Sequence, residues 1–243
     1  MVVDIENSSG RPEYVRGRLQ RDTHDVIGRA LAEAGVKSGE FTLDERGDGA
    51  LVTLPSDASK SRLTEVCLHS LPAQLRRLAV QHSEFGRLRL RVSLNAGDIS
   101  RTDQGSWLGT AVDTAFRLVD AEATKAALAA SKDAVMVLIV SDSWFEDVVR
   151  PGLGAAMDDE FRKLTITSHQ RDFPAWLALP GVVPAMAAAS AHASVNVSES
   201  ESGSDAVSDH GHAGSRDTYY VSGDHIGRDK NVTNYYGEGA GPE

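Results

Sequence analysis

The sequence predicts an α+β fold over residues 1–183, and two observations support it. Apolar residues switch along the chain between the two-residue spacing of a strand and the three-to-four spacing of a helix. Beyond Pro184 the composition shifts to Ala, Ser, Glu, Gly and His, which bury too little apolar surface to offset chain entropy. We therefore expect one domain, a disordered linker over 184–216 and a short β-prone motif over 217–243.

Each element is justified by its own pattern. Strands are predicted, in chain order, at residues 1–5, 41–43, 50–54, 88–95, 134–140, 161–168 and 175–179. Helices are predicted at residues 12–34, 59–82, 108–130 and 144–149. Gly47-Asp48-Gly49 supplies the turn of an antiparallel hairpin. Pro72 should interrupt or kink the second helix, and Pro151 should stop the fourth, which Ser141 or its neighbours cap.

Composition excludes several classes of protein. Cys67 is the single cysteine among 243 residues, so no intrachain disulfide can form. The sequence shows no leader and no run of about 18 apolar residues, so we expect a cytoplasmic protein without a membrane partner. Residues 184–243 hold nine acidic and three basic side chains, so they carry −6 of the net charge of −10. The remaining −4 on the domain argues against a nucleic-acid partner, but it permits a nucleotide bound with metal ions.

Four segments carry a family resemblance. They are Val2-Val3-Asp4-Ile5-Glu6, Gly47-Asp48-Gly49-Ala50-Leu51-Val52, Leu90 to Asp98, and Gly109 to Leu118. In this order they resemble the catalytic domain of the class III nucleotidyl cyclases, over roughly residues 1–181. The resemblance implies a ferredoxin-like core and a homodimer whose active sites lie between subunits. It also implies a nucleoside triphosphate substrate, which is converted to a cyclic monophosphate and pyrophosphate.

The resemblance assigns a metal site. Asp4 and Asp48 would bridge two Mg²⁺ or Mn²⁺ ions per site, with the Ile5 carbonyl as a further ligand. Amides of residues 7–10, at the start of the following helix, would receive phosphate oxygens. The family's glycine and phenylalanine after the first aspartate are replaced by Asn7 and Ser8. The alternative is that Asp4 caps local structure and Asp48 only shapes the hairpin.

Two positions would read the base. Asp44 takes the main base-reading position, and a carboxylate there accepts hydrogen bonds from guanine but cannot donate to adenine. Guanine, or a base read through water, is thus favoured over adenine. The second position falls near Ser106, which can donate or accept. The alternative for Asp44 is a solvated charge on a hairpin.

Further residues would act on the phosphates. Arg117 matches the arginine that stabilises charge on the α-phosphate, while Asp113 replaces an asparagine that orients the ribose. Asp113 could instead pair with Arg117 four residues later. His169, with Lys163 as a nearby substitute, matches a lysine that grips the terminal phosphates.

Three functional hypotheses follow. The first is a metal-dependent cyclase, including one that serves bacterial antiphage signalling. The second is a catalytically degenerate cyclase-like domain that senses nucleotide or partner and signals through its tail. The third is a scaffold in which only the tail matters. Residues 217–237 have the look of β motifs in bacterial immune proteins and would pair with a partner protein, or else form one marginal hairpin in a solvated tail.

The remaining residues and motifs indicate no further functional site. Arg87, Arg89 and Arg91 alternate along one strand and are expected to form a solvated face. Cys67 lies on an apolar helix face and is expected to be buried. The sequence contains no Ser-His-Asp, Walker or zinc pattern.

Overall fold

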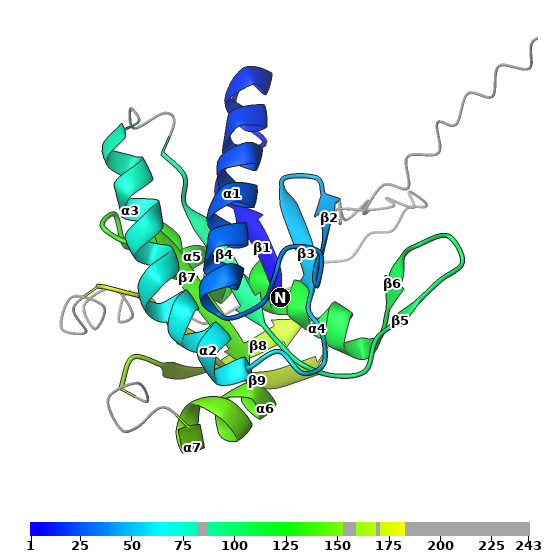
Figure 1. Ribbon diagram of the computed structural model, residues 1–243. Helices are drawn as coiled ribbons and strands as arrows, with labels where there is room; N and C mark the ends of the chain where they lie inside the picture. The colour runs from blue at the N-terminus through cyan, green and yellow to red at the C-terminus, as the bar shows by residue number, and fades with distance from the viewer. Residues whose placement is uncertain (82–86, 153–158, 169–170, 183–243) are drawn as a thin grey trace, which may run out of the picture. The chain divides into compact units, whose positions relative to one another are not determined.

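A seven-stranded sheet organises the domain in the computed structural model, which describes residues 1–81, 87–152, 159–168 and 171–182 (Figure 1). The strand order is β2-β3-β1-β4-β7-β9-β8, and every neighbouring pair is antiparallel except β4 and β7. Its strands are β1 (Val2–Ile5), β2 (Thr42–Arg46), β3 (Gly49–Thr53), β4 (Leu90–Leu94), β7 (Met136–Ser141), β8 (Arg162–Ser168) and β9 (Arg171–Ala178). All seven predicted strands are confirmed.

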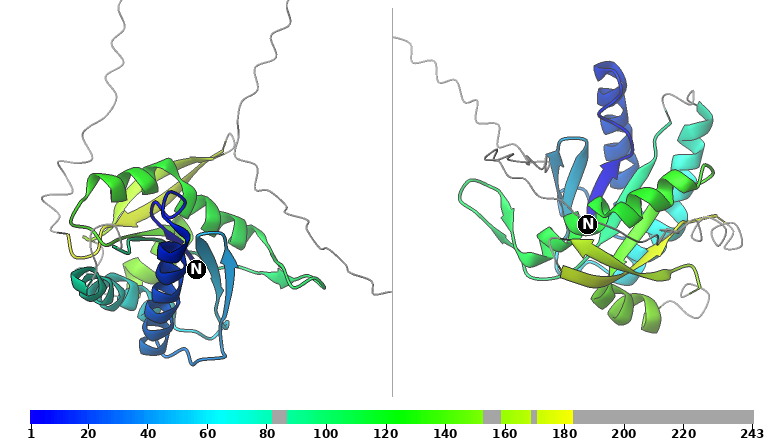
Figure 2. Two further views of the ribbon diagram at one scale, coloured as in Figure 1. Left: turned by 90° about the horizontal axis from the view of Figure 1, so that it is seen from above. Right: turned by 180° about the vertical axis from the view of Figure 1, so that it is seen from behind.

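Helices cover both faces of this sheet, as the view from above shows (Figure 2). One layer holds α1 (Glu13–Glu33), α2 (Lys60–Glu65), the π-helical turn η1 (Val66–Ser70) and α3 (Leu71–Gln81). The other holds α4 (Thr110–Asp120) and α5 (Glu122–Ala130). A third helical segment after β7 comprises α6 (Asp142–Trp144), the π-helical turn η3 (Phe145–Val149) and α7 (Arg150–Gly152). The α+β class is thus confirmed.

The alternation along the strands explains why both faces are covered. On β7, Met136, Leu138 and Val140 belong to the core under α1 and α3, whereas Val137 and Ile139 face the other way, toward the α4 and α5 side. Each of these five residues is 0% exposed. A strand buried on both faces reads as a continuous apolar run, which is what residues 134–140 show.

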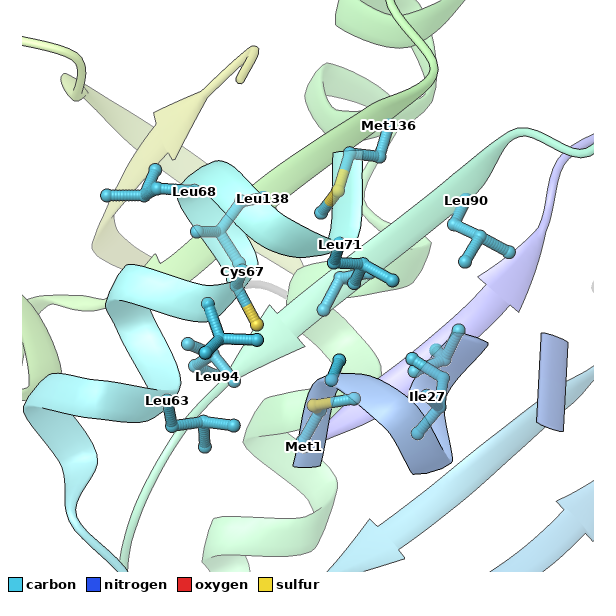
Figure 3. Packing of buried hydrophobic residues seen from close by; sticks show 14 of the residues in the cluster. Met1, Ile27, Leu63, Cys67, Leu68, Leu71, Leu90, Leu94, Met136 and Leu138 are labelled. Atoms are coloured by element: carbon cyan, nitrogen blue, oxygen red, sulfur yellow. The ribbon is translucent and has the colours of Figure 1, made fainter. Parts of the chain in front are cut away.

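The larger core lies between β1, β4, β7 and the first helical layer (Figure 3). Cys67 points its sulfur into this cluster, beside Leu94 and Leu63 in the close-up view. Burial raises the pKa of the Cys67 thiol to about 12, so the thiol stays protonated and behaves as a small apolar side chain. Its predicted burial is confirmed.

The two helix-borne prolines are accommodated by π-helical turns. Leu71 and Arg150, each directly before a proline, donate their N–H to the carbonyl five residues earlier, on Val66 and Phe145. Because a proline has no N–H, a wider turn just ahead of it re-pairs carbonyls that the ordinary ladder would leave without a donor. The predicted interruption near Pro72 is confirmed. The prediction that Pro151 stops its helix is wrong, since α7 continues through it to Gly152.

The predicted helix over 108–130 is wrong in two places. A short hairpin, β5 (Ser100–Arg101) with β6 (Trp107–Leu108), precedes α4 and projects to the side opposite α3 (Figure 1). The chain then breaks at Ala121, whose ψ of 138° is extended and separates α4 from α5. At the base of the hairpin, Gly109 has a φ of +144° and lies so close to the Asp98 carbonyl that a Cβ would sit 2.6 Å from it. Glycine is required there.

Several predictions concern residues outside the described part of the chain. The linker over 184–216 and the motif over 217–243 fall there, and so does His169. Within the described residues, no helix combines the length and apolarity needed to cross a bilayer.

Candidate functional site

Asp4 and Asp48 lie at the same end of two neighbouring strands. Asp4 is opposite Gly49 in the antiparallel pair β1 and β3, and the Ile5 N–H donates to the carbonyl of Asp48 over 3.2 Å. A Cβ at Gly49 would lie 2.5 Å from the carbonyl oxygen of Val3, so only glycine permits this close approach. The Gly-Asp-Gly turn thus brings the second predicted carboxylate beside the first.

The pKa of the Asp4 carboxyl group is shifted from its ordinary value. Burial raises the pKa of Asp4 to about 6, the Arg91 guanidinium opposes that rise, and the negative charges of Asp48 and Asp120 add to it. Asp48 acts on Asp4 only because the two carboxylates are near each other. The structure therefore brings together the pair that the sequence analysis selected.

Arg91 already holds Asp4. Its Nε donates to Oδ2 over 2.6 Å, and its Nη2 contacts the same oxygen. The two side chains, each 14% exposed, lie opposite each other on β4 and β1. Arg89 makes a similar pair with Glu6, with Nη1 2.9 Å from Oε2 and Glu6 buried.

The prediction of a solvated arginine face is therefore wrong for Arg89 and Arg91. Their face of the strand lies under α4 and α5, and cross-strand partners satisfy their charges. Sequence alternation could not show this, since an amphipathic strand looks the same whether its polar side meets water or partner charges.

The segment after β1 is a loop. Asn7 has a φ of +52°, in the left-handed region, and α1 begins only at Glu13. The amides of residues 7–10 therefore do not belong to a helix start, and that prediction is wrong. Ser8 is buried, and its carbonyl accepts from the Arg11 N–H over 3.0 Å, so the loop folds back on itself.

Asp44, the predicted base-reading residue, is tied to a residue that the sequence analysis did not select. Asp44 is half-buried on β2, and its Oδ2 accepts from the Trp107 Nε1–H over 2.8 Å. Ser106, the predicted second reader, is exposed at the hairpin turn, where its N–H donates to Thr102 Oγ1 over 3.0 Å. No sequence signal identifies Trp107, because β6 has only two residues and Asp44 lies 63 residues away along the chain.

Asp113 and Arg117 both lie exposed on α4. No ion pair joins these two within the described part of the chain, so the alternative in which Asp113 neutralises Arg117 is not what this structure shows. The arginine is thus displayed outward, where a second molecule can meet it.

Lys163, on β8, contacts Asp142. Its Nζ lies 3.3 Å from Oδ1 of Asp142, and its ammonium lies 5.2 Å from the ring centre of Trp176. The side chain remains 54% exposed. Lys163 and Trp176 lie opposite each other near the carboxyl end of β7, whereas Asp4 lies beside the amino end of β4. Since β4 and β7 are parallel, Lys163 and Asp4 occupy opposite ends of the sheet of one chain.

The donor set fits a cation that arrives with a phosphate ligand. Across the described residues, no three His, Cys, Asp or Glu side chains gather as a metal cage. Mg²⁺ is commonly bound by one or two carboxylates plus substrate phosphates and water, and Asp4 and Asp48 can supply the former. The Nε and Nη2 contacts from Arg91 are both to Oδ2 of Asp4, so Oδ1 is the oxygen that would meet an ion.

A cavity of about 330 Å³ lies elsewhere. It is lined by Thr53, Leu63, Leu94, Val112 and Trp144 among others, at the far end of β3 and β4 from Asp4, and none of the predicted site residues lines it. This cavity is therefore not the site of Asp4 and Asp48.

Comparison with known proteins gives the same fold. No family model matches the sequence, and no curated protein matches it either. Among solved structures, the chain is similar to an adenylate/guanylate cyclase/hydrolase from Silicibacter pomeroyi, with a TM-score of 0.50 and 19% identity over 74% of this chain and 96% of that one. It also matches the guanylyl cyclase Cya2, with a TM-score of 0.44 and 16% identity over 73% of this chain and 87% of that one. The fold is that of the class III cyclases.

Proposed function

We propose that this protein is a metal-dependent nucleotidyl cyclase that converts a nucleoside triphosphate to a cyclic monophosphate and pyrophosphate. The observation that carries the proposal is the convergence of Asp4 and Asp48 at one end of a cyclase-type sheet, close enough for the charge of one to raise the pKa of the other. Two like charges are held together at a cost, and a divalent cation between them removes that cost.

The reaction joins the ribose 3′ oxygen to the α-phosphorus, and the bond from that phosphorus to the bridging oxygen breaks as pyrophosphate leaves. Mg²⁺ or Mn²⁺, two per site, would acidify the hydroxyl and neutralise charge on the phosphates. Asp4 and Asp48 would hold the ions, with the Ile5 carbonyl as a further candidate ligand. The 3′ proton passes to water or to a phosphate oxygen.

The remaining groups would orient the substrate. The Arg117 guanidinium is a permanent cation with a fork of donors, suited to the charge that builds on the α-phosphate. Asp113, one turn earlier on α4, would accept from a ribose hydroxyl. Lys163 would leave Asp142 for the terminal phosphates, with His169 as the second candidate.

We propose that two copies complete each site. Asp4 and Asp48 would come from one protomer, and the exposed Asp113 and Arg117 of α4 would come from its partner. Support comes from the outward display of Asp113 and Arg117, both of which are exposed on α4.

The test is to incubate the protein with each of the four nucleoside triphosphates and Mn²⁺, and to search for cyclic monophosphates by mass spectrometry. Asp48→Ala and Arg117→Ala should each lower the product by about 100-fold or more, since each removes one required charge. Asp57→Ala, at an exposed carboxylate before α2, is the control and should leave product unchanged. Failure to form product from any triphosphate, with the dimer intact, contradicts the proposal.

A second function has a specific observation in its favour. Two of the predicted functional carboxylates, Asp4 and Asp44, are already bonded within the chain, by Arg91 and Trp107. A domain that binds nucleotide without turning it over, and that signals through residues 217–237, would be compatible with such occupied groups. Calorimetry that detects nucleotide binding without product would select this function. Either function could serve antiphage signalling, in which the cyclic product or the tail carries the message.

A further inference from the structure

The hydrogen bond from Trp107 to Asp44 fixes the position of the β5–β6 hairpin and also the orientation of the Asp44 carboxylate. It joins β6 to β2 and reaches the carboxylate that would read the base. The indole N–H is a donor only, and the ionised carboxylate is an acceptor only, so the bond can run in one direction alone. In this contact Trp107 is therefore always the donor and Asp44 always the acceptor.

The surroundings hold Trp107 in place. Its ring packs against the apolar cluster beneath α4, which includes Leu51 and Val112, and the Arg101 guanidinium lies 5.5 Å from the ring centre. Arg101 in turn donates from Nε to the carbonyl of Gly105 over 3.1 Å. The hairpin and the indole are thus packed and tethered together, and the N–H cannot turn away without breaking this packing.

Asp44 is placed by its strand. It lies opposite Leu51, whose side chain belongs to the cluster beneath α4, so both side chains lie on the α4 face of the sheet. Trp107 donates to Oδ2, so Oδ1 is the oxygen that would meet a base. The Asp44 carboxylate is consequently a hydrogen-bond acceptor whose orientation is fixed by Trp107, and it does not rotate freely.

We infer that Trp107 is the positioning residue for base selection, and that through it the site takes bases with a ring N–H donor, guanine and uracil, in preference to adenine and cytosine. Guanine N1–H and uracil N3–H donate to a carboxylate oxygen. The ring nitrogens of adenine and cytosine at the corresponding edge are acceptors and repel it. The inference rests on the proposed nucleotide site and specifies its selectivity.

An amide at position 44 makes the role of Trp107 visible. In Asp44→Asn, the indole N–H pairs with the amide oxygen and turns the NH₂ group toward the ligand. The reading group then becomes a donor, which suits adenine and cytosine. In Asp44→Asn/Trp107→Phe the same amide has no partner to orient it, so it can present either end.

The experiment measures equilibrium binding of α,β-methylene triphosphates of all four bases to the full chain with Mn²⁺, by calorimetry. These analogues cannot lose pyrophosphate, so binding is read without turnover. Wild type should bind the guanine and uracil analogues about tenfold more tightly than the other two, in line with one buried polar mismatch. Asp44→Asn should invert that preference by a similar factor, and the double variant should show a preference of about threefold at most.

Trp107→Phe keeps an aromatic side chain in a smaller ring and removes the donor, so it should keep the wild-type order of bases with a smaller spread. The inference is overturned if Asp44→Asn has the same base preference with Trp107 or Phe at position 107, or if wild type prefers adenine or cytosine. Cyclic product from wild type with no influence of Trp107 overturns this inference alone. The expected binding pattern without any product overturns only the proposed cyclase activity, and no binding of any analogue overturns both.

Discussion

Arg91 and Asp4 face each other across β4 and β1, and the guanidinium donates through Nε and Nη2 to a single oxygen of the carboxylate, Oδ2. Arg91 thus occupies part of the space around Asp4 that a divalent cation would use. A positive side chain next to a metal carboxylate competes with the ion for the same negative charge. The strength of metal binding should therefore depend on Arg91.

Arg91→Met tests this competition, because methionine retains an unbranched side chain and loses the charge. Without metal, the variant should be about 2–4 kcal/mol less stable than wild type, since Asp4 loses its partner in a largely buried position. With Mn²⁺, the stabilisation should be larger in the variant than in wild type, because no cation competes for Asp4.

Thermal unfolding with Mn²⁺ and with EDTA measures both effects without any assay of catalysis. Asp4→Asn is the matched control and should lose most of the response to Mn²⁺. An equal rise in Tm with Mn²⁺ in wild type and Arg91→Met would show that Arg91 does not compete for the site.

The raised pKa of Asp4 predicts a pH dependence of stability. Its pKa is about 6 in the fold against an ordinary value of 3.8, with burial as the main cause. Folded protein then holds this proton more tightly than unfolded protein does, so the contribution is fully present below about pH 4 and is lost as pH rises through 6. A shift of about two units corresponds to about 3 kcal/mol.

Urea unfolding in EDTA between pH 4 and 7 gives the measurement. The free energy of unfolding of wild type minus that of Asp4→Asn should fall by about 3 kcal/mol up to pH 6 and then level off. The subtraction removes the other titrating groups. A difference that grows with pH would mean that the ion pair with Arg91 outweighs burial.

Secondary structure was predictable where burial imposed a long apolar pattern, which is periodic on α1 and continuous on β7. It was not predictable where the signal is short or tertiary. Strands of two residues, such as β5 and β6, show no period, and Ala121 breaks a helix although alanine favours helix. Tertiary partners, and not local sequence, decide these features.

The candidate site likewise has residues that the sequence predicted and partners that it did not. Asp4 and Asp48 were selected through the family resemblance, on the order and spacing of the segments that carry it. The partners of Asp4 and Asp44 escaped prediction, because Arg91 meets Asp4 across 87 residues of chain and Trp107 meets Asp44 across 63. Such pairings exist only once the sheet and the hairpin are assembled.

Gly49→Ala should damage the fold and the approach of Asp48 to Asp4 together. The added Cβ would lie 2.5 Å from the Val3 carbonyl oxygen and 3.5 Å from the Cβ of Asp4, so β1 and β3 must separate. We expect a loss of about 1–3 kcal/mol in stability, typical of overpacking, and weaker Mn²⁺ binding.

Gly28→Ala is the matched control for that substitution. Gly28 lies within α1 with nothing within 4 Å of an added Cβ, so alanine there should stabilise the protein by about 0.5–1 kcal/mol. Urea unfolding and calorimetry with Mn²⁺ compare the two variants. Unchanged stability and Mn²⁺ affinity in Gly49→Ala would mean that the contact between β1 and β3 is not needed for the site.

Sharing of the site between protomers predicts rescue on mixing. Asp48→Ala and Arg117→Ala should each be inactive alone, because each removes one half of every site. In a re-equilibrated equal mixture, half of the dimers contain one of each chain, and one of their two sites is intact, so about a quarter of wild-type cyclase activity should return. Product formation is measured with the triphosphate that wild type turns over.

Mixing Asp48→Ala with Asp4→Asn is the control for that rescue. Both substitutions lie in the metal half of the site, so every site in the mixed dimer keeps one defect and activity should stay absent. The same absence in the mixture of Asp48→Ala and Arg117→Ala would show that each chain builds its site alone. Arg117 would then have to turn inward toward Asp4, although the residue is exposed on α4.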